Sequence, residues 1–334
     1  GERYIRGGVV DPMPRKKINR ILFHHHSLHQ KTRHENETIA LEHFEELRDD
    51  FALRGRCEMF RVDLKSMAAA HQLHQGTNLR GHLVWARMRH FQRLLTIRNV
   101  QAPDEDEDIL QFFREHHDPV IFMERHAMRR GEFRKLISPL VRSGHLVQDY
   151  RGGFKTVEPI RSYDLWEVKR DYLRDLVKDY PVITLKQVER LAGSPFSAEE
   201  ISDVMREFEE DGTLIKGFLV DDMHDVCWGR HDLLDGSDAL TRTRDLVIPP
   251  SDPLIHYYGS LLRERFGYGS AYLVFHREEP VAAFKANTRE GVIHITDFVG
   301  DSDLEKEALR VMKEFAWEHD MPLKGKLYER LRTR

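Results

Sequence analysis

Basic side chains are concentrated in two stretches of this sequence, and lysine and arginine are the residues that neutralise nucleic-acid phosphates. The first stretch is the N-terminal segment, whose candidate phosphate contacts are Arg15, Lys16, Lys17, Arg20, His26 and Arg33. The second stretch runs from residue 129 to residue 155, with the candidates Arg129, Arg130, Arg134, Lys135, Arg151 and Lys155. The whole chain has a formal net charge of −4. The local concentrations, and not the overall charge, therefore predict a DNA ligand.

A run of histidines at His24, His25 and His26, followed by His29 and His34, suggests a metal site. Successive side chains on an extended backbone point to opposite sides, so three neighbours cannot all face one ion. The sequence offers no cysteine pair and no closely spaced helical histidine pair to complete such a site. We therefore expect no metal, and histidines that line a polar groove. A phosphate-cradling glycine loop and a GxSxG elbow are both missing, so ATP hydrolysis and serine hydrolysis have no support. No cofactor is expected.

The second basic stretch lies in a segment whose pattern predicts three helices and a hairpin. ILQFFREHH, FMERHAM and GEFRKLISPLVRSG are typical of helices, and Gly144 closes the last one. HLVQDYRGGFKTV is typical of two strands joined by a tight turn. This order predicts a winged helix over residues 104–160, whose third helix would enter a major groove. Pro139 inside that helix is expected to bend it.

The same order recurs over residues 161–235, which predicts a second winged helix. Thr184 with Gln187, and Ser197 with Glu200, have the spacing of capping boxes at the second and third helices. The third helix would repel phosphates, because it carries Glu199, Glu200, Asp203, Glu207, Glu209, Glu210 and Asp211. This unit is therefore expected to be structural, or to face a protein partner.

The rest of the chain completes an α+β fold: tandem winged helices followed by a small C-terminal domain of strands and a helix. Residues 1–103 are expected to be mostly helical, with helices over 38–53 and 81–95. The acidic, proline-containing QAPDEDED ends this region. In residues 236–334, AYLVFH, PVAAFKA and VIHITDFV are typical of strands, and DLEKEALRVMKEFAWEH of an amphipathic helix.

Composition indicates an ordinary globular protein of 334 residues, with 40% hydrophobic residues. No apolar run is long enough for a membrane span, and the N-terminus lacks the apolar core of a secretory signal. The two cysteines, Cys57 and Cys227, are far apart in the sequence. These features predict a cytoplasmic protein in a reducing compartment, with no membrane association.

Two C-terminal segments resemble the winged-helix DNA glycosylases that repair alkylated and crosslinked DNA. LVIPPSDPLIHYYGSLLRERFGY is similar to a strand and helix segment of that family, and AAFKANTREGVIHI to its hairpin. Lys285, Arg289 and Gly291 match the hairpin pattern. A related module occurs in large helicase-related proteins. The resemblance implies a concave face that binds double-stranded, damaged DNA, a role in DNA repair, and DNA contacts from Lys285 and Arg289.

The family's catalytic signature, Gln-x-Gln or Gln-x-Asp, would fall on Arg15, Lys16 and Lys17 in this sequence. Cleavage of an N-glycosidic bond builds positive charge on the sugar and needs a carboxylate or amide oxygen nearby. Arginine and lysine carry the wrong sign and offer no acceptor. The catalytic residues are therefore unknown at this stage. Lys17, as a nucleophile, and Asp63, as a carboxylate, are the candidates.

Three functions remain open from the sequence. The first is a DNA-binding repair protein of this family whose catalytic motif is replaced. The second is an active DNA glycosylase that excises alkylated or crosslinked bases. The third is a regulatory module that docks on a protein partner through the acidic second winged helix.

Overall fold

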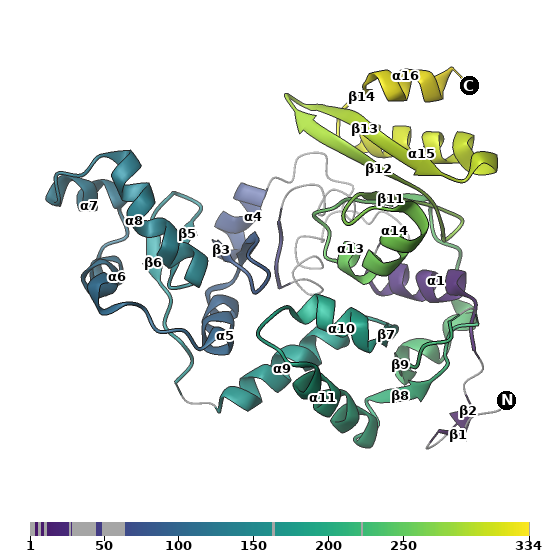
Figure 1. Cartoon of the computed structure of the whole chain (residues 1–334), viewed down its shortest axis with the longest axis horizontal. Helices are drawn as coiled ribbons and strands as arrows, with labels where there is room; N and C mark the ends of the chain where they lie inside the picture. Colours follow the sequence, from purple (N-terminus) through teal and green to yellow (C-terminus); the bar gives the residue numbers. More distant parts are fainter. Residues whose placement is uncertain are drawn as a thin grey trace.

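The computed structural model describes residues 12–26, 28, 45–48, 64–161, 164–221 and 223–333, together with the backbone of residues 4–5 and 8–9. In these ranges, no helix is long and apolar enough to cross a membrane. The described elements form an arch in Figure 1, with α6 to α8 (residues 107–143) at one end and β11 to β14 (residues 272–324) at the other. The second helix–hairpin unit, which contains α9 to α11, lies along the base between them.

Short strands and helices alternate in the described residues before position 100. They are β1 (Tyr4–Ile5), β2 (Gly8–Val9), α1 (Arg15–His25), α4 (Leu64–His71), β3 (His74–Thr77), β4 (Leu83–Ala86) and α5 (Met88–Arg98). Strands β3 and β4 form an antiparallel hairpin, and β3 also pairs with the later strand β5 (Leu146–Asp149). With β6 (Phe154–Thr156), these strands form a four-stranded sheet of order β4-β3-β5-β6. The N-terminal segment thus shares a sheet with the helix–hairpin unit that follows it.

Two helices expected in this segment differ from the described structure, the first at Leu47 and the second only at its start. Leu47, inside the expected helix 38–53, forms an antiparallel bridge with Trp85 through N–H to carbonyl bonds of 2.9 and 2.7 Å. Residues 83–86, inside the expected helix 81–95, form β4, and α5 begins only at Met88. Pairing between distant segments overrides local helical periodicity, because the backbone bonds of Leu47 are satisfied by Trp85.

The first helix–hairpin unit follows the predicted order. After the 3-10 turn Asp104–Asp106 come α6 (Glu107–Glu115), α7 (Pro119–Arg125), α8 (Arg130–Ser143), β5 and β6 (Phe154–Thr156). Gly144 ends α8 with a φ of 89°, and Gly152 supports the hairpin turn with a φ of 91°. Helix α8 runs without interruption through Pro139.

The second helix–hairpin unit adds one strand to the same order. Its elements are α9 (Leu165–Val177), β7 (Val182–Thr184), α10 (Leu185–Ala192), α11 (Ala198–Glu210), β8 (Leu214–Gly217) and β9 (Cys227–Arg230). The strands form a sheet of order β7-β9-β8. Both predicted capping boxes are confirmed: Thr184 caps α10 with Gln187, and Ser197 caps α11 with Glu200.

The C-terminal segment folds around a five-stranded sheet of order β10-β11-β12-β13-β14. Its elements are α12 (His231–Leu234), a 3-10 turn (Ser237–Ala239), β10 (Leu246–Ile248), α13 (Leu254–Tyr257), α14 (Gly259–Phe266), β11 (Tyr272–His276), β12 (Glu279–Arg289), β13 (Val292–Gly300), a 3-10 turn (Ser302–Leu304), α15 (Glu305–Glu318), β14 (Leu323–Lys324) and α16 (Lys326–Arg332). The predicted strands and helix are confirmed. The turn between β12 and β13 is tight, because only Glu290 and Gly291 leave the ladder, with φ values of 50° and 73°.

Two of the buried cores show how the arch is held together. One large cluster runs through α5, α9 to α11, and the C-terminal strands and helices, and includes Leu94, Phe208 and Phe275. The first helix–hairpin unit has a separate cluster of its own, centred on Phe113 and Phe133. The second unit is therefore fused to the body of the molecule, whereas the first packs largely around itself.

Candidate functional site

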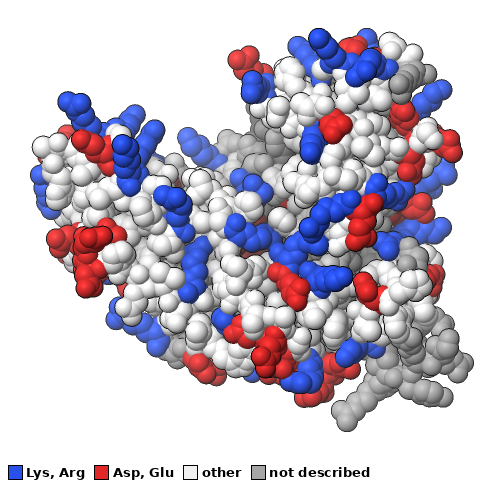
Figure 2. Space-filling model, in the orientation of Figure 1, with Lys and Arg blue, Asp and Glu red and all other residues white. Residues whose placement is uncertain are grey.

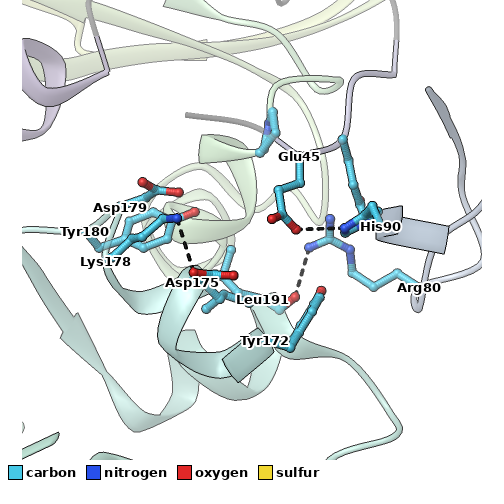
Figure 3. Close-up of a pocket in the computed structure, with 12 residues that line it drawn as sticks. Glu45, Arg80, His90, Tyr172, Asp175, Lys178, Asp179, Tyr180 and Leu191 are labelled. Atoms are coloured by element: carbon cyan, nitrogen blue, oxygen red, sulfur yellow. Dashed lines mark hydrogen bonds and ion pairs between the residues drawn. The ribbon is translucent and has the colours of Figure 1, made fainter. Parts of the chain in front are cut away.

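A pocket with a volume of about 110 Å³ lies between the segment around Glu46, the hairpin β3–β4, and the helices α5, α9 and α10. Its lining residues are Glu45, Glu46, Arg80, His90, Tyr172, Asp175, Leu176, Lys178, Asp179, Tyr180, Leu191 and Pro253. By the same measure of volume, a single water molecule needs only about 10–15 Å³. The pocket therefore has room for several waters or for a small planar group. In Figure 3, Glu45 projects into it between His90 and Lys178.

Local structure fixes the two sides of this pocket. His90 lies on the buried face of α5 together with Phe91 and Leu94. Asn78 forms the turn after β3, where its Oδ1 accepts from the backbone N–H groups of Arg80 and His82 at 3.0 and 2.9 Å. These contacts hold the turn that carries Arg80 against the pocket.

His90 binds two adjacent carboxylates at once. Its Nδ1 is 2.7 Å from Oε2 of Glu45, and its Nε2 is 2.9 Å from Oε1 of Glu46. Asn78 donates from Nδ2 to the other oxygen of Glu46 at 2.8 Å. The His90 side chain is 6% exposed. The result is a buried carboxylate–imidazole–carboxylate cluster.

The three side chains of this cluster stabilise one another in their charged forms. Burial opposes protonation of His90, but the hydrogen bonds and charges of Glu45 and Glu46 outweigh it and raise the pKa of His90 to about 9. Burial also opposes ionisation of Glu45, but His90 and Arg93 outweigh it and lower the pKa of Glu45 to about 2. At Glu46 too, burial opposes ionisation, but His90 and Arg80 outweigh it and lower the pKa of Glu46. At neutral pH the cluster is an imidazolium between two carboxylates.

The remaining walls carry both charge signs and two aromatic rings. Arg93 pairs with Asp175 at 2.8 Å and lies 3.5 Å from Oε2 of Glu45. Tyr172 and Tyr180 contribute the aromatic surface. Burial, with smaller contributions from nearby charges, raises the pKa of both phenols, so they stay neutral. The pocket thus places ionised carboxylates beside apolar rings.

A histidine pair lies beside this site, on the same hairpin turn and on α13. The rings of His82 and His256 stack with centroids 6.3 Å apart. Burial, aided by Arg80, His82 and Arg48, lowers the pKa of His256 to about 3. Burial and the charges of Arg48 and Arg80 also lower the pKa of His82. Both rings are therefore neutral at pH 7.

The residues first considered for catalysis are not in this pocket. Arg15, Lys16 and Lys17 begin α1, and none of the residues lining the pocket belongs to that helix. Lys17 forms an ion pair with Asp238 at 2.5 Å. The side chain of Lys17 is thus held by Asp238, outside the pocket. Asp63 lies outside the described residues.

Other N-terminal candidates are held in contacts within the protein. Arg20 binds the carboxylate of Glu278 through two hydrogen bonds of 2.8 and 2.7 Å. His26 is buried, and its Nε2 bonds the carbonyl of Asp179 at 2.8 Å. Arg33 lies outside the described residues. The first contact joins α1 to the turn between β11 and β12, and the second joins the residue after α1 to the loop after α9. Both side chains are therefore occupied within the protein.

The expected arrangement of the histidine run is wrong, because His24 and His25 belong to α1 and not to an extended segment. His24 Nε2 bonds the carbonyl of Thr241 at 2.8 Å, and His25 Nε2 lies 3.6 Å from a carboxylate oxygen of Asp179. In the described part of the chain, no group of three or more histidine, cysteine, aspartate or glutamate side chains could hold a metal ion.

The basic residues of the first helix–hairpin unit lie at one end of the arch. Arg129, Arg130, Arg134 and Lys135 are exposed around the start of α8, and no ion pair joins them to any described residue. Arg151 is exposed and donates to the hydroxyl of Tyr150, while Lys155 is half-buried on β6. Figure 2 shows Lys and Arg gathered over α7 and α8, with acidic groups on the opposite edge over α6.

The C-terminal hairpin carries the two remaining basic candidates. Lys285 and Arg289 are both exposed on β12. The ammonium of Lys285 lies 4.8 Å from the centre of the Tyr268 ring. Arg289 is next to the turn at Glu290 and Gly291, at the free end of the hairpin.

The acidic helix α11 is partly neutralised within its own unit. Glu200 pairs with Lys169 at 2.6 Å, and Asp211 with Arg174 at 3.3 Å. Asp203 pairs with Arg206 one turn along the helix. These pairs reduce the negative field that α11 presents to a partner.

Comparison with known proteins bears on the fold. No protein-family model matches the sequence, and no curated protein sequence does. The solved structure of the DNA glycosylase AlkZ of Streptomyces sahachiroi matches with a TM-score of 0.63, at 10% sequence identity, over 94% of this chain and 100% of that one. This chain has the AlkZ fold. The resemblance suggested by the C-terminal segments is thereby confirmed at the level of fold.

Sequence reasoning missed the central residues of the pocket. Glu45, Glu46 and His90 were assigned to the faces of amphipathic helices, where a charged residue has no special meaning. The adjacent glutamates are separated from His90 by more than forty positions. A signal existed only in the histidine of MRHFQRLL, which falls on the apolar face of its helix.

Proposed function

We propose that this protein is a DNA glycosylase that binds duplex DNA and hydrolyses the N-glycosidic bond of a damaged nucleotide in the pocket around Glu45. The observation that carries the proposal is the pair of ionised carboxylates, Glu45 and Glu46, in a pocket of a chain with a glycosylase fold. A role in DNA repair follows from that reaction.

The proposed DNA contacts come from two winged helices, of which the first, residues 104–160, reads the duplex. Its third helix begins with cations that have no partner among the described residues, which suits them to phosphates. Lys285 and Arg289 on the C-terminal hairpin form a second set of contacts. The second winged helix, residues 161–235, supplies pocket residues. Residues 1–103 and 236–334 are the flanking domains.

The proposed chemistry is electrostatic. As the base leaves, positive charge develops on the sugar, and an ionised carboxylate beside it stabilises that charge. A carboxylate oxygen can also hold the attacking water in place. The lining residues contain four carboxylates against three cations, Arg80, Lys178 and protonated His90. Arg93, which contacts Glu45 and Asp175 from behind, balances the fourth carboxylate. The pocket therefore has no net positive charge to attract a phosphate, which must be held by the cations outside it.

The second candidate function is DNA binding without hydrolysis. It is favoured by the pKa of Glu45, about 2, because a carboxylate of such low basicity is a poor proton acceptor at neutral pH. In that case the pocket would recognise a damaged base and leave it intact.

A single assay separates these functions. Duplex DNA that carries alkylated purines is incubated with the protein and then heated in alkali, which breaks the strand at abasic sites. We expect breaks with the wild-type protein and a loss of about 10²- to 10⁴-fold in rate for Glu45→Gln, with unchanged DNA affinity. The matched control is Glu105→Gln, which removes an exposed charge from the turn before α6.

Two outcomes would overturn the proposal. If no breaks appear above those without enzyme while binding is normal, the protein binds DNA without hydrolysis. If binding itself does not weaken with increasing salt, phosphates are not the ligand and both candidate functions fail.

A further inference from the structure

Glu45 and Glu46 are adjacent in the sequence but differ in how they are held. Both oxygens of Glu46 are engaged, by His90 at 2.9 Å and by Asn78 at 2.8 Å, and its side chain is 16% exposed. Glu46 is therefore fixed between a helix and a turn. It has little freedom to approach a substrate.

Glu45 is held from one side only. Its Oε2 accepts from His90 at 2.7 Å and lies 3.5 Å from Arg93. Its Oε1 has no hydrogen bond or ion pair to another described residue, and the side chain is 46% exposed at the pocket. Among the described residues, one oxygen of Glu45 is thus left unpaired at the pocket that a water or a sugar would enter.

We infer that His90 is a positioning residue that gives the two glutamates different roles, an inference that rests on the proposed function. It anchors Glu46 as a fixed support and turns the free oxygen of Glu45 toward the reacting sugar. A neutral imidazole has only one N–H group, so it can donate to only one carboxylate. Both bonds at once require the imidazolium.

The surroundings of His90 favour that charged state. The described groups that face the cluster are Glu45 and Glu46 from the preceding segment, Arg93 from α5, Asn78 and Arg80 from the β3–β4 turn, Tyr172 and Asp175 from α9, and Lys178 and Asp179 just after it. The two carboxylates in direct contact outweigh the cations around them, and the pKa of His90 lies near 9. The division of roles should therefore hold at neutral pH and fail in alkali, as His90 loses its proton.

The test uses the full chain and three substitutions. His90→Gln removes the charge, and His90→Lys keeps a cation with several N–H donors. His224→Gln is the matched control, because His224 is an exposed loop residue outside the pocket. Excision rates are measured as kcat and KM between pH 6 and pH 10. The imidazole nitrogens of ¹⁵N-histidine-labelled protein are followed by NMR without DNA.

We expect His90→Gln to lose about 10- to 100-fold in kcat at pH 7 with little change in KM, because the free oxygen of Glu45 is displaced. The wild-type rate should fall above pH 9, and this alkaline fall should disappear in His90→Gln. His90→Lys should recover part of the rate, and His224→Gln should match the wild type. The NMR signals that disappear in His90→Gln should show two protonated ring nitrogens at pH 7.

Either of two results would overturn the inference: a neutral His90 at pH 7, or a His90→Gln protein with the wild-type rate and pH profile. The NMR measurement does not depend on excision. A protonated His90 in a protein that excises nothing would overturn the proposed reaction and leave the carboxylate cluster as a binding device.

Discussion

The two helix–hairpin units repeat one order of elements but place their charges differently. In the first unit the cations around the start of α8, such as Arg130 and Arg134, are exposed and have no ion-pair partner among the described residues. In the second unit the equivalent helix α11 is acidic, and Glu200 and Asp211 pair with cations of α9. The difference teaches that a shared backbone order fixes a shape, while surface charge decides what that shape can bind.

The hydrophobic cores of the two units also differ, in how far each extends beyond its own unit. Phe113 and Phe133 of the first unit belong to a cluster confined to that unit. Phe208 of the second unit belongs to the cluster that continues into α5 and the C-terminal strands. Tyr172 and Asp175, on the same unit, line the pocket. The first unit is therefore a separable module, and the second is part of the body that carries the pocket.

The largest expected effect follows the removal of a buried phenylalanine ring, and the units should differ in how far the lost hydrogen-exchange protection spreads. Phe113→Ala and Phe208→Ala each remove a fully buried ring and should lower the free energy of unfolding by about 3–5 kcal/mol. For Phe113→Ala, the loss of hydrogen-exchange protection should be confined to residues 104–160. For Phe208→Ala, it should extend to α5 and β11. Equal spreading in both variants would contradict the separation of the cores.

Removal of the charges on the third helix of each unit should affect the affinity for DNA differently in the two units. The quadruple variant Arg129→Gln, Arg130→Gln, Arg134→Gln and Lys135→Gln should bind duplex DNA about 10- to 100-fold more weakly at low salt. The slope of log affinity against log salt should become shallower by about one for each phosphate that is no longer neutralised. The counterpart on α11 is Glu199→Gln, Glu207→Gln, Glu209→Gln and Glu210→Gln, which should bind DNA equally well or more tightly. Similar weakening in both would remove the distinction.

The smallest expected effect concerns the start of α11. Its N-cap Ser197 accepts from the backbone N–H of Glu200 at 3.1 Å. Ser197→Ala should lower the free energy of unfolding by about 1 kcal/mol, as measured by denaturant unfolding, because that N–H loses its partner. Ser194→Ala, in the exposed loop before α11, is the control. An unchanged stability for Ser197→Ala would mean that water replaces the cap without cost.

Local sequence signals were sufficient for most elements after residue 104. Capping pairs such as Thr184 with Gln187, and glycines such as Gly144 with positive φ, mark helix ends through interactions only a few residues long. The same reasoning failed at Leu47, whose backbone bonds go to Trp85. It also failed for the site, because Lys17 and Arg20 looked free in the sequence but meet Asp238 and Glu278 in the fold.

The sequence by itself determined the repeated helix–hairpin order, the unequal charge of α8 and α11, and the C-terminal strands, because each depends on neighbours within a turn or a hairpin. Only the tertiary structure decided which charges remain available. It brought Glu45 and Glu46 onto His90, and it placed Glu278 on Arg20. Electrostatic energy depends on distance and burial, and for residues so far apart along the chain both are set by the fold.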